Sequence, residues 1–387
     1  MKEPSRRWRN LAAAAGAVTA VMFAAFDLYQ WALAYAGDRF HNDFTFYYVA
    51  ARIGLSHGWP SIYDLGLQQA ELNAIGSGIT VAELARYISP PPVAWLALPF
   101  TVLPYEIAYW AWSALLLAAL FLTWWFAAPG AGRTRLILLA AAAGWLPVIY
   151  GLQLGQPGLF VALGVAASYA LLRAGRPFLA GLALGALALK PQLAFLVPLA
   201  LLVAGQRRAF AGSVVALGAL ALASVAALGA DGVREYLDRL SFASSVPVNR
   251  ELTLAFVLGD AARPAQIFTA SWTMLLAYRA RHRGLEWTYA IALLGGMLAT
   301  PYVHLDDLVM LGLAGWLFLR AAPWTAGYVL AFAILIEGEP IWGPATVIGV
   351  ELGALIVLSV AVLRRAQPAP AAPQQAPGRS RQPTTLR

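Results

Sequence analysis

The stretch PFLAGLALGALALKPQLAFLVPLALLVAG, residues 177–205, decides how the chain is arranged in space. It is apolar except around Lys190, which is followed by Pro191 near the middle of the stretch. One helix through all of it would carry a proline, which breaks helices, and a charge in apolar surroundings. Two short helices that meet at this pair would instead form a hairpin, with both ends of the stretch on the same side.

The composition of the chain indicates a protein that lies mostly within a membrane. The sequence has 387 residues, of which 60% are hydrophobic and 12% charged, and its mean hydropathy is +0.65. This composition is typical of an all-α polytopic membrane protein. Apolar runs recur from residue 10 to residue 363, so we expect 1–363 to form one membrane-embedded domain. The tail 364–387 contains five Arg and five Pro and no acid, and is predicted to be a disordered, cytoplasmic, basic segment.

The distribution of basic residues selects the hairpin. Loops that carry many Lys and Arg remain in the cytoplasm. With a cytoplasmic N-terminus and a hairpin at Lys190, the basic clusters all lie inside: Arg133/Arg135, Arg173/Arg176, Arg207/Arg208, Arg279/Arg281/Arg283, Arg320 and Arg364/Arg365. A single span would place every later cluster outside. We therefore predict about twelve transmembrane or re-entrant helices with both termini cytoplasmic. The spans besides the hairpin are 10–36, 103–127, 133–151, 157–173, 209–229, 264–281, 285–300, 305–320, 323–337 and 343–363.

The first outer loop, 37–102, is the longest segment outside the predicted spans. Residues 44–55 and 66–87 have apolar residues at helical spacing, which predicts two amphipathic helices on the membrane surface. The preceding segment 10–36 has either of two roles. It is long for the apolar part of a signal peptide, which favours an uncleaved signal anchor, although AYA at 34–36 resembles a cleavage site.

On this topology the polar residues gather at the outer face. Asp43 lies in HNDFTFYYVAARIG (41–54), among aromatic residues, where an apolar environment would raise its pKa and suit a general base. Its position also fits a helix N-cap. Lys190 is either a cation for a phosphate or carboxylate at the floor of an outer cavity, or a side chain that snorkels to the interface.

Other polar residues complete this outer set. In TPYVHLDDLVM (300–310), His304 and Asp307 are one helical turn apart and could bind a phosphate, and a metal site is only weakly indicated, so none is expected. His304 could equally be an ordinary loop residue. Candidates for contacts to a sugar or an acceptor are Gln153, Gln156, Asn249, His41 and Asp307, and Arg250 is a further candidate for a donor phosphate. Gln153 and Gln156 could instead belong to a tight interhelical turn, and Arg250 to a solvated loop.

Several classes of protein are excluded or disfavoured. The chain has no cysteine, so disulfides and thiolate nucleophiles are excluded. It has no GxxxxGK[ST], GxGxxG or HExxH motif, so a nucleotide cofactor or a zincin-type metal is not expected. An enzyme of this composition needs a substrate borne by the membrane. One alternative is a membrane transporter or a lipid or polysaccharide flippase, although the sequence shows no repeated half of the kind that transporters often have. The other alternative is a non-catalytic scaffold or polysaccharide-export partner, which would tolerate loss of Asp43 and Lys190.

The sequence resembles the C-type superfamily of membrane glycosyltransferases, and most closely glycosyltransferase family 87. The matching segments are DFTFYYVAARIGLSHGWPSIYD, YISPPPVAWLALPFTVLP, GQPGLFVALGVAASYALLRAGRPFLAGLALGALALKPQLAFLVPLALL, NRELTLAFVL and TPYVHLDDLVML, in this order over residues 40–310. The resemblance implies transfer, with inversion, of a sugar such as mannose from a polyprenyl-phosphate donor to a lipid- or glycan-linked acceptor.

The resemblance also implies roles for individual residues. Asp43 matches the acidic residue expected to be the base, and Lys190 and His304 match positions near the donor phosphate. The enzyme would contain no cofactor, would bind lipid and no nucleic acid, and would face the outside of a bacterial plasma membrane. The Arg-rich, Lys-poor composition is consistent with such a source.

Overall fold

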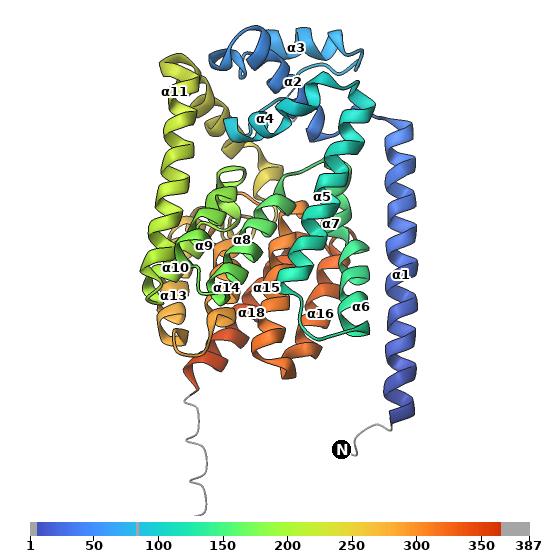
Figure 1. Cartoon of the computed structure of the whole chain (residues 1–387), viewed down its shortest axis with the longest axis vertical. Coiled ribbons are helices and arrows are strands. Elements are labelled where there is room, and N and C mark those ends of the chain that lie inside the picture. Colours follow the sequence, from blue (N-terminus) through green and yellow to red (C-terminus); the bar gives the residue numbers. More distant parts are fainter. Residues whose placement is uncertain (1–5, 83–84, 365–387) are drawn as a thin grey trace, which may run out of the picture.

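The computed structural model describes residues 6–82 and 85–364, and within these ranges the regular structure is entirely helical (Figure 1). The helices are α1 Arg6–Gly37, α2 Asp43–Ser56, α3 Leu65–Ala74, α4 Pro91–Ala97, α5 Tyr105–Ala127, α6 Arg133–Ala143, α7 Leu146–Leu154, α8 Gly158–Arg173, α9 Pro177–Ala183, α10 Leu196–Val203, α11 Arg207–Ser245, α12 Leu254–Leu258, α13 Ala262–Ala280, α14 Leu285–Ala299, α15 Val309–Ala321, α16 Ala326–Glu337, α17 Glu339–Trp342 and α18 Pro344–Leu363. The all-α prediction is confirmed. The tail 365–387 is outside the described residues, and the domain boundaries remain a prediction.

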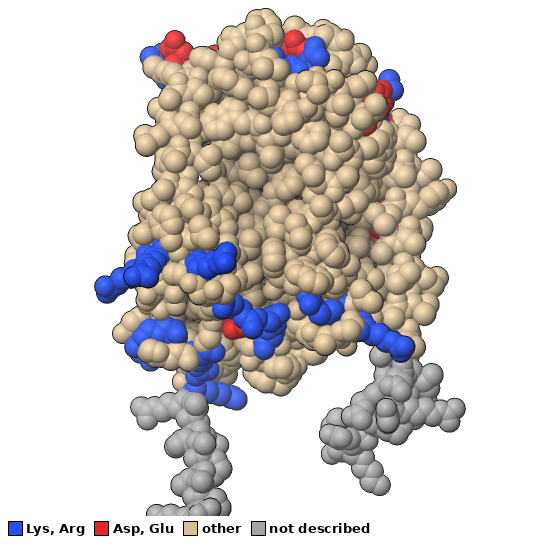
Figure 2. Space-filling view, viewed as in Figure 1, with Lys and Arg blue, Asp and Glu red and all other residues tan. Residues whose placement is uncertain are grey.

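Basic residues gather at one end of the helical bundle, which we call the basic end (Figure 2). Arg320 donates to Ala128 O, at the end of α5, and Arg283 donates to Val362 O and Arg364 O, at the end of α18. The first turn of α1 also lies at this end (Figure 1). The opposite end carries α2, α3 and α4, and we call it the loop end. The bundle therefore has the charge asymmetry that the sequence predicts for the two sides of a membrane.

Few of the described helices are long enough to cross a membrane unbroken. Four helices in the described part of the chain are long and apolar enough: Ala14–Gly37, Tyr105–Ala127, Arg207–Ser245 and Pro344–Leu363. The pair α6 and α7, bent by 55°, makes a fifth if it counts as one broken span. The remaining apolar helices have 10–17 residues, too short to cross ~30 Å of hydrocarbon unbroken. The chain is a multi-pass membrane protein, but the prediction of twelve spans is not confirmed.

The stretch 177–205 forms the predicted hairpin. A Cβ on Gly181 would collide with Ala209 O, and one on Gly212 would collide with Phe178 O. The start of α9 therefore packs against the start of α11, and residues 177 and 207 lie at the same end of the bundle. Between them the chain passes through two 3-10 turns, Leu184–Ala188 and Pro191–Leu193, and returns as α10. Proline removes a backbone donor and so ends the first arm at Lys190.

The first outer loop differs from its prediction. Helix α2 is not an amphipathic surface helix, because ten of its fourteen residues are buried. It packs against α3 and α4 and against the N-terminal half of α5, where Phe44 contacts Trp112. The predicted helix 66–87 ends at Ala74. Gly76 and Gly78 both have positive φ (69°), a backbone region that glycine adopts easily and that ends a helix.

Candidate active site

Asp43 is the first residue of α2 and not its N-cap. The Asn42 side chain accepts from Thr45 N and caps the helix. This leaves the partly exposed Asp43 carboxylate free to face the bundle, where Gln156 Nε2 donates to Asp43 Oδ2. Tyr47, one turn further along α2, donates from its hydroxyl to Gln156 Oε1 at 3.2 Å. The amide of Gln156 is therefore held from both sides, and it orients the carboxylate.

The turn between α7 and α8 brings Gln156 to Asp43. Gly155 ends α7 with φ 70°, and its carbonyl accepts from Trp112 Nε1 at 2.8 Å. A Cβ at Gly155 would lie 2.8 Å from Phe44 Cβ, so glycine is needed both for the backbone conformation and for the close approach of α2. The sequence GQPG thus encodes a turn that fixes an amide next to the start of α2.

Lys190 lies at the tip of the hairpin and pairs with two carboxylates. Its Nζ donates to Asp306 Oδ2 at 2.8 Å and to Asp307 Oδ1 at 2.5 Å. All three side chains are buried, and Lys190 is 8% exposed. Removing the lysine, or the aspartates, would leave the opposite charge buried and unpaired. The ion pairs therefore hold the tip of the hairpin against the segment that precedes α15.

His304 lies beside the same aspartates. Its backbone N–H donates to Asp307 Oδ2 at 3.0 Å, and its ring stacks on Tyr302. Its Nε2 is 2.7 Å from Asn249 Oδ1, and Asn249 Nδ2 donates to Ala243 O at 2.6 Å. Because this second bond fixes Asn249 Oδ1 as the atom that faces the ring, His304 Nε2 carries the proton and Nδ1 is the second, titratable nitrogen.

The local charges determine the protonation of this cluster. Burial, with the nearby charge of Asp306, raises the pKa of Asp43 to about 6, although Lys190, His304 and the Gln156 hydrogen bond oppose the shift. Burial and the charge of Lys190 lower the pKa of His304 below its usual value, against the opposing effect of the carboxylates. At neutral pH Asp43 is thus a carboxylate near the pH at which it accepts a proton, and His304 is neutral. This combination suits general-base chemistry.

Six of the nine predicted site residues converge. Asp43, Gln156, Lys190, Asp307, His304 and Asn249 are linked by the hydrogen bonds and charge interactions described above. His41 is exposed and lies 3.6 Å from Asp38, Gln153 contributes its backbone carbonyl to the Tyr109 hydroxyl, and Arg250 is exposed next to Asn249. The structure thus separates a buried cluster from three peripheral side chains.

Sequence reasoning missed several members of the cluster. Asp306 was not selected, yet it shares Lys190 with Asp307, and its Oδ1 is buried without a hydrogen-bond partner in the described structure. Tyr47, Tyr150 and Tyr302 were also missed, and the hydroxyl group of each lies close enough to the aspartates of the cluster to interact with their charge. The adjacent acids in HLDD were a usable signal for Asp306. For the tyrosines, which are common in apolar segments, the sequence offers no such signal.

A metal site is not evident in this arrangement. Within residues 6–82 and 85–364, no group of three or more His, Asp or Glu side chains has the geometry of a metal site. Lys190 occupies the position between Asp306 and Asp307 that a cation would take.

The helical fold indicates a multi-pass membrane protein, and this cluster gathers titratable side chains within it. Comparison with known families makes the class specific. The family model described as "Glycosyltransferase family 87" matches residues 87–303, more than half of the chain. The chain belongs to this family and is a glycosyltransferase. The resemblance of the sequence to glycosyltransferase family 87 is confirmed, and the transporter, flippase and scaffold alternatives are set aside.

The matched region contains Gln156, Lys190 and Asn249, whereas Asp43, His304 and Asp307 lie outside it. No curated protein and no solved structure matches the chain. The family therefore establishes glycosyl transfer, and the roles of individual residues rest on the geometry.

Proposed function

We propose that the protein transfers a sugar, mannose, from a polyprenyl-phosphate donor to a hydroxyl of a lipid- or glycan-linked acceptor, with inversion and with Asp43 as the general base. The observation that carries this proposal is the state of Asp43. Its carboxylate is partly exposed, oriented by Gln156, and has a pKa raised to about 6. A base with these properties can accept the proton of an acceptor hydroxyl at neutral pH.

A lipid-linked donor is supported by the surroundings of the site. The chain belongs to a glycosyltransferase family and contains no nucleotide-binding motif, and the candidate site is surrounded by apolar helices. A donor carried by the membrane accounts for all three properties. The acceptor oxygen would bond to the anomeric carbon as the carbon–oxygen bond to the phosphate breaks, while the acceptor proton passes to Asp43.

Lys190 and His304 are proposed to contact the donor phosphate. The Lys190 ammonium has three N–H groups, of which two donate to aspartates, so one remains for a phosphate oxygen. His304 can take up a proton at Nδ1 when an anion approaches, because a nearby negative charge favours the imidazolium. Arg250 would add a positive charge at the rim, and Asn249, Gln153, Asp307 and His41 are proposed for sugar or acceptor contacts.

The site is proposed to face the outside of a bacterial plasma membrane, with both termini in the cytoplasm. The arginine-rich basic end supports this orientation, because such residues remain on the cytoplasmic side. The candidate site includes Asp43, the first residue of α2, and α2 belongs to the opposite, loop end.

The test measures sugar transfer in membranes that contain the protein and polyprenyl-phosphate-mannose labelled in the sugar. The wild type and the control Asp38→Asn, which removes an exposed carboxylate of the same loop, should both transfer mannose. Asp43→Asn at the same expression level should lose about 10²- to 10⁴-fold of the rate. Equal rates for Asp43→Asn and the wild type would refute the base. Transfer from polyprenyl-phosphate-arabinose but not from the mannose donor would refute the sugar, and a product that retains the anomeric configuration would refute inversion.

A further inference from the structure

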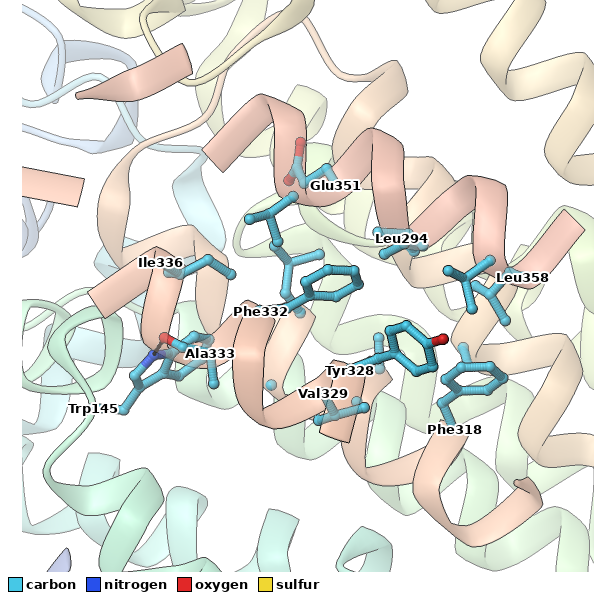
Figure 3. A pocket seen from close by; sticks show the side chains of 18 residues that line it. Trp145, Leu294, Phe318, Tyr328, Val329, Phe332, Ala333, Ile336, Glu351 and Leu358 are labelled. Atoms are coloured by element: carbon cyan, nitrogen blue, oxygen red, sulfur yellow. Dashed lines mark hydrogen bonds between the residues drawn. The ribbon is translucent and has the colours of Figure 1, made fainter. Parts of the chain in front are cut away.

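A cavity of about 90 Å³ lies among α14, α15, α16 and α18, with Trp145 at one side (Figure 3). Its lining is almost wholly apolar and includes Leu311 and Phe318 of α15, Phe332 and Ile336 of α16, and Leu358 of α18. No Lys or Arg contributes to the lining. The cavity is formed by a different set of helix faces from those that hold Asp43 and Lys190.

Helices α16 and α18 form two sides of the cavity wall. Helix α18 runs toward the basic end, and α16 runs the opposite way after the turn at Pro323. The cavity wall extends along α18 from Val350 to Leu358 and along α16 from Tyr328 to Ile336. Each of these two runs has nine residues and spans about 12 Å at the helical rise. The wall therefore follows the direction in which lipid chains lie, and it is long enough to contact the first part of such a chain, next to its hydroxyl.

The polar feature of the lining that needs a partner is Glu351, at the end of the cavity toward the loop end. It is 1% exposed, and its Oε1 has no hydrogen-bond partner in the described part of the chain. A buried polar group without a partner is costly, and a carboxyl group within a membrane helix commonly marks a ligand or proton pathway. The unpartnered atom therefore points to a missing partner in the cavity.

We propose that this cavity binds a lipid alcohol, a single alkyl chain with its hydroxyl hydrogen-bonded to Glu351. The apolar walls suit the chain, because burying it removes apolar surface from the solvent. A phosphate head group does not suit the site, since it would meet a carboxyl group with no cation in the lining. A hydroxyl both donates and accepts, so it satisfies the carboxyl group in either protonation state.

The ligand would also hold α16 in place. Of the residues of α16 only Ile336 is buried, so protein contacts alone fix this helix weakly. A chain in the cavity would contact α16 on one side and α15 and α18 on the other. Because a ligand that binds only the folded state stabilises it, binding should raise the unfolding temperature. This proposal does not rest on the sugar donor or on Asp43.

The test is photo-crosslinking of the purified full-length protein in detergent with a diazirine-bearing hexadecanol, followed by mapping of the labelled peptides. We expect labelling of α16 and α18, with 1-hexadecanol competing at least about tenfold better than hexadecane, the effect of one hydrogen bond to a carboxyl group. Glu351→Gln should retain the label, and Glu351→Leu should lose it. The control Ile356→Leu, on the exposed side of α18, should label like the wild type.

Other outcomes would overturn the proposal. Equal competition by hexadecane would make the cavity a non-selective apolar space. Stronger competition by hexadecyl phosphate or by polyprenyl phosphate would assign it to an anionic lipid or to the donor chain, and stronger competition by hexadecylamine would assign it to a cation. Absence of label from α16 and α18 would exclude a ligand there. The competition series uses the wild type only, so it decides the question even if Glu351→Leu does not fold.

Discussion

The hydrogen bond from Gln156 to Asp43 gives a prediction about the pH at which the enzyme becomes active. Gln156 is 7% exposed, and its amide donates to the carboxylate and accepts from the Tyr47 hydroxyl. This bond stabilises the ionised carboxylate and lowers a pKa that burial raises to about 6. Gln156→Leu removes the donor and keeps most of the side-chain volume, so the pKa of Asp43 should rise further.

The size of the shift follows from the strength of the bond. A hydrogen bond to a charged group contributes about 1.5–3 kcal/mol, and one pKa unit corresponds to about 1.36 kcal/mol, so the pKa should rise by about one to two units. The base is active only when ionised. The acidic limb of kcat/KM against pH should therefore move from near pH 6 in the wild type to between about pH 7 and about pH 8 in Gln156→Leu.

The assay is sugar transfer from the labelled polyprenyl-phosphate donor between pH 5 and pH 9, with kcat/KM measured at each pH. Tyr47→Phe should produce a smaller upward shift, because it removes only the bond that holds the amide of Gln156. The control Gln206→Leu, near the start of α11 at the basic end, should leave the limb in place. An acidic limb at the same pH in Gln156→Leu and the wild type would refute the assignment of Gln156 as the positioning residue of Asp43.

Three further predictions concern stability and packing. Because the pKa of Asp43 is raised in the folded state, ionisation of Asp43 lowers the stability of the protein as pH rises from about 4 to about 6. Asp43→Asn should abolish this fall in unfolding temperature, and at pH 7 the variant should unfold at the same temperature as the wild type or higher. A lower unfolding temperature of the variant at pH 7 would contradict the raised pKa. Lys190→Met should destabilise the fold by about 3–5 kcal/mol, because it leaves two buried aspartates unpaired. The control Arg279→Met changes an exposed residue and should keep the stability of the wild type. Equal denaturation midpoints for Lys190→Met and the wild type would refute the pairing. Gly181→Ala should lower the unfolding temperature, because the added Cβ would overlap the backbone of α11 and such overpacking costs about 1–3 kcal/mol. The control Gly218→Ala has open space around the added Cβ and should keep the unfolding temperature of the wild type. Equal losses in the two variants would contradict the close packing of α9 and α11.

The sequence predicted the helical class and the hairpin for reasons that are local. Apolar runs, the proline after Lys190 and the clustering of arginines are each visible along the chain, and each acts through the cost of placing charge or an unpaired backbone group in the membrane. The predicted count of about twelve transmembrane or re-entrant helices is not confirmed. Apolar content does not measure helix length, and several apolar runs are broken into short helices that other helices cover.

The first outer loop shows the limit of periodicity. Residues 44–55 have a pattern that suits a surface helix, but α2 is buried on most of its faces. Helical spacing indicates one apolar face, and it does not reveal whether α3, α4 and α5 cover the others. The end of α3 at Ala74 was accessible in principle, because Gly76 and Gly78 follow it.

By itself the sequence determined the class of protein and the hairpin at Lys190, and it selected Asp43 as a candidate because this acid lies among aromatic residues. Tertiary structure alone decided what each charge contacts. Asp43, Gln156, Lys190 and Asp306 are separated by 34 to 263 positions along the chain, and a pKa or a hydrogen bond depends on distances of a few ångströms between groups that folding brings together. Glu351 illustrates the same point, because only the packing of four helices leaves its carboxyl group facing an apolar cavity without a partner.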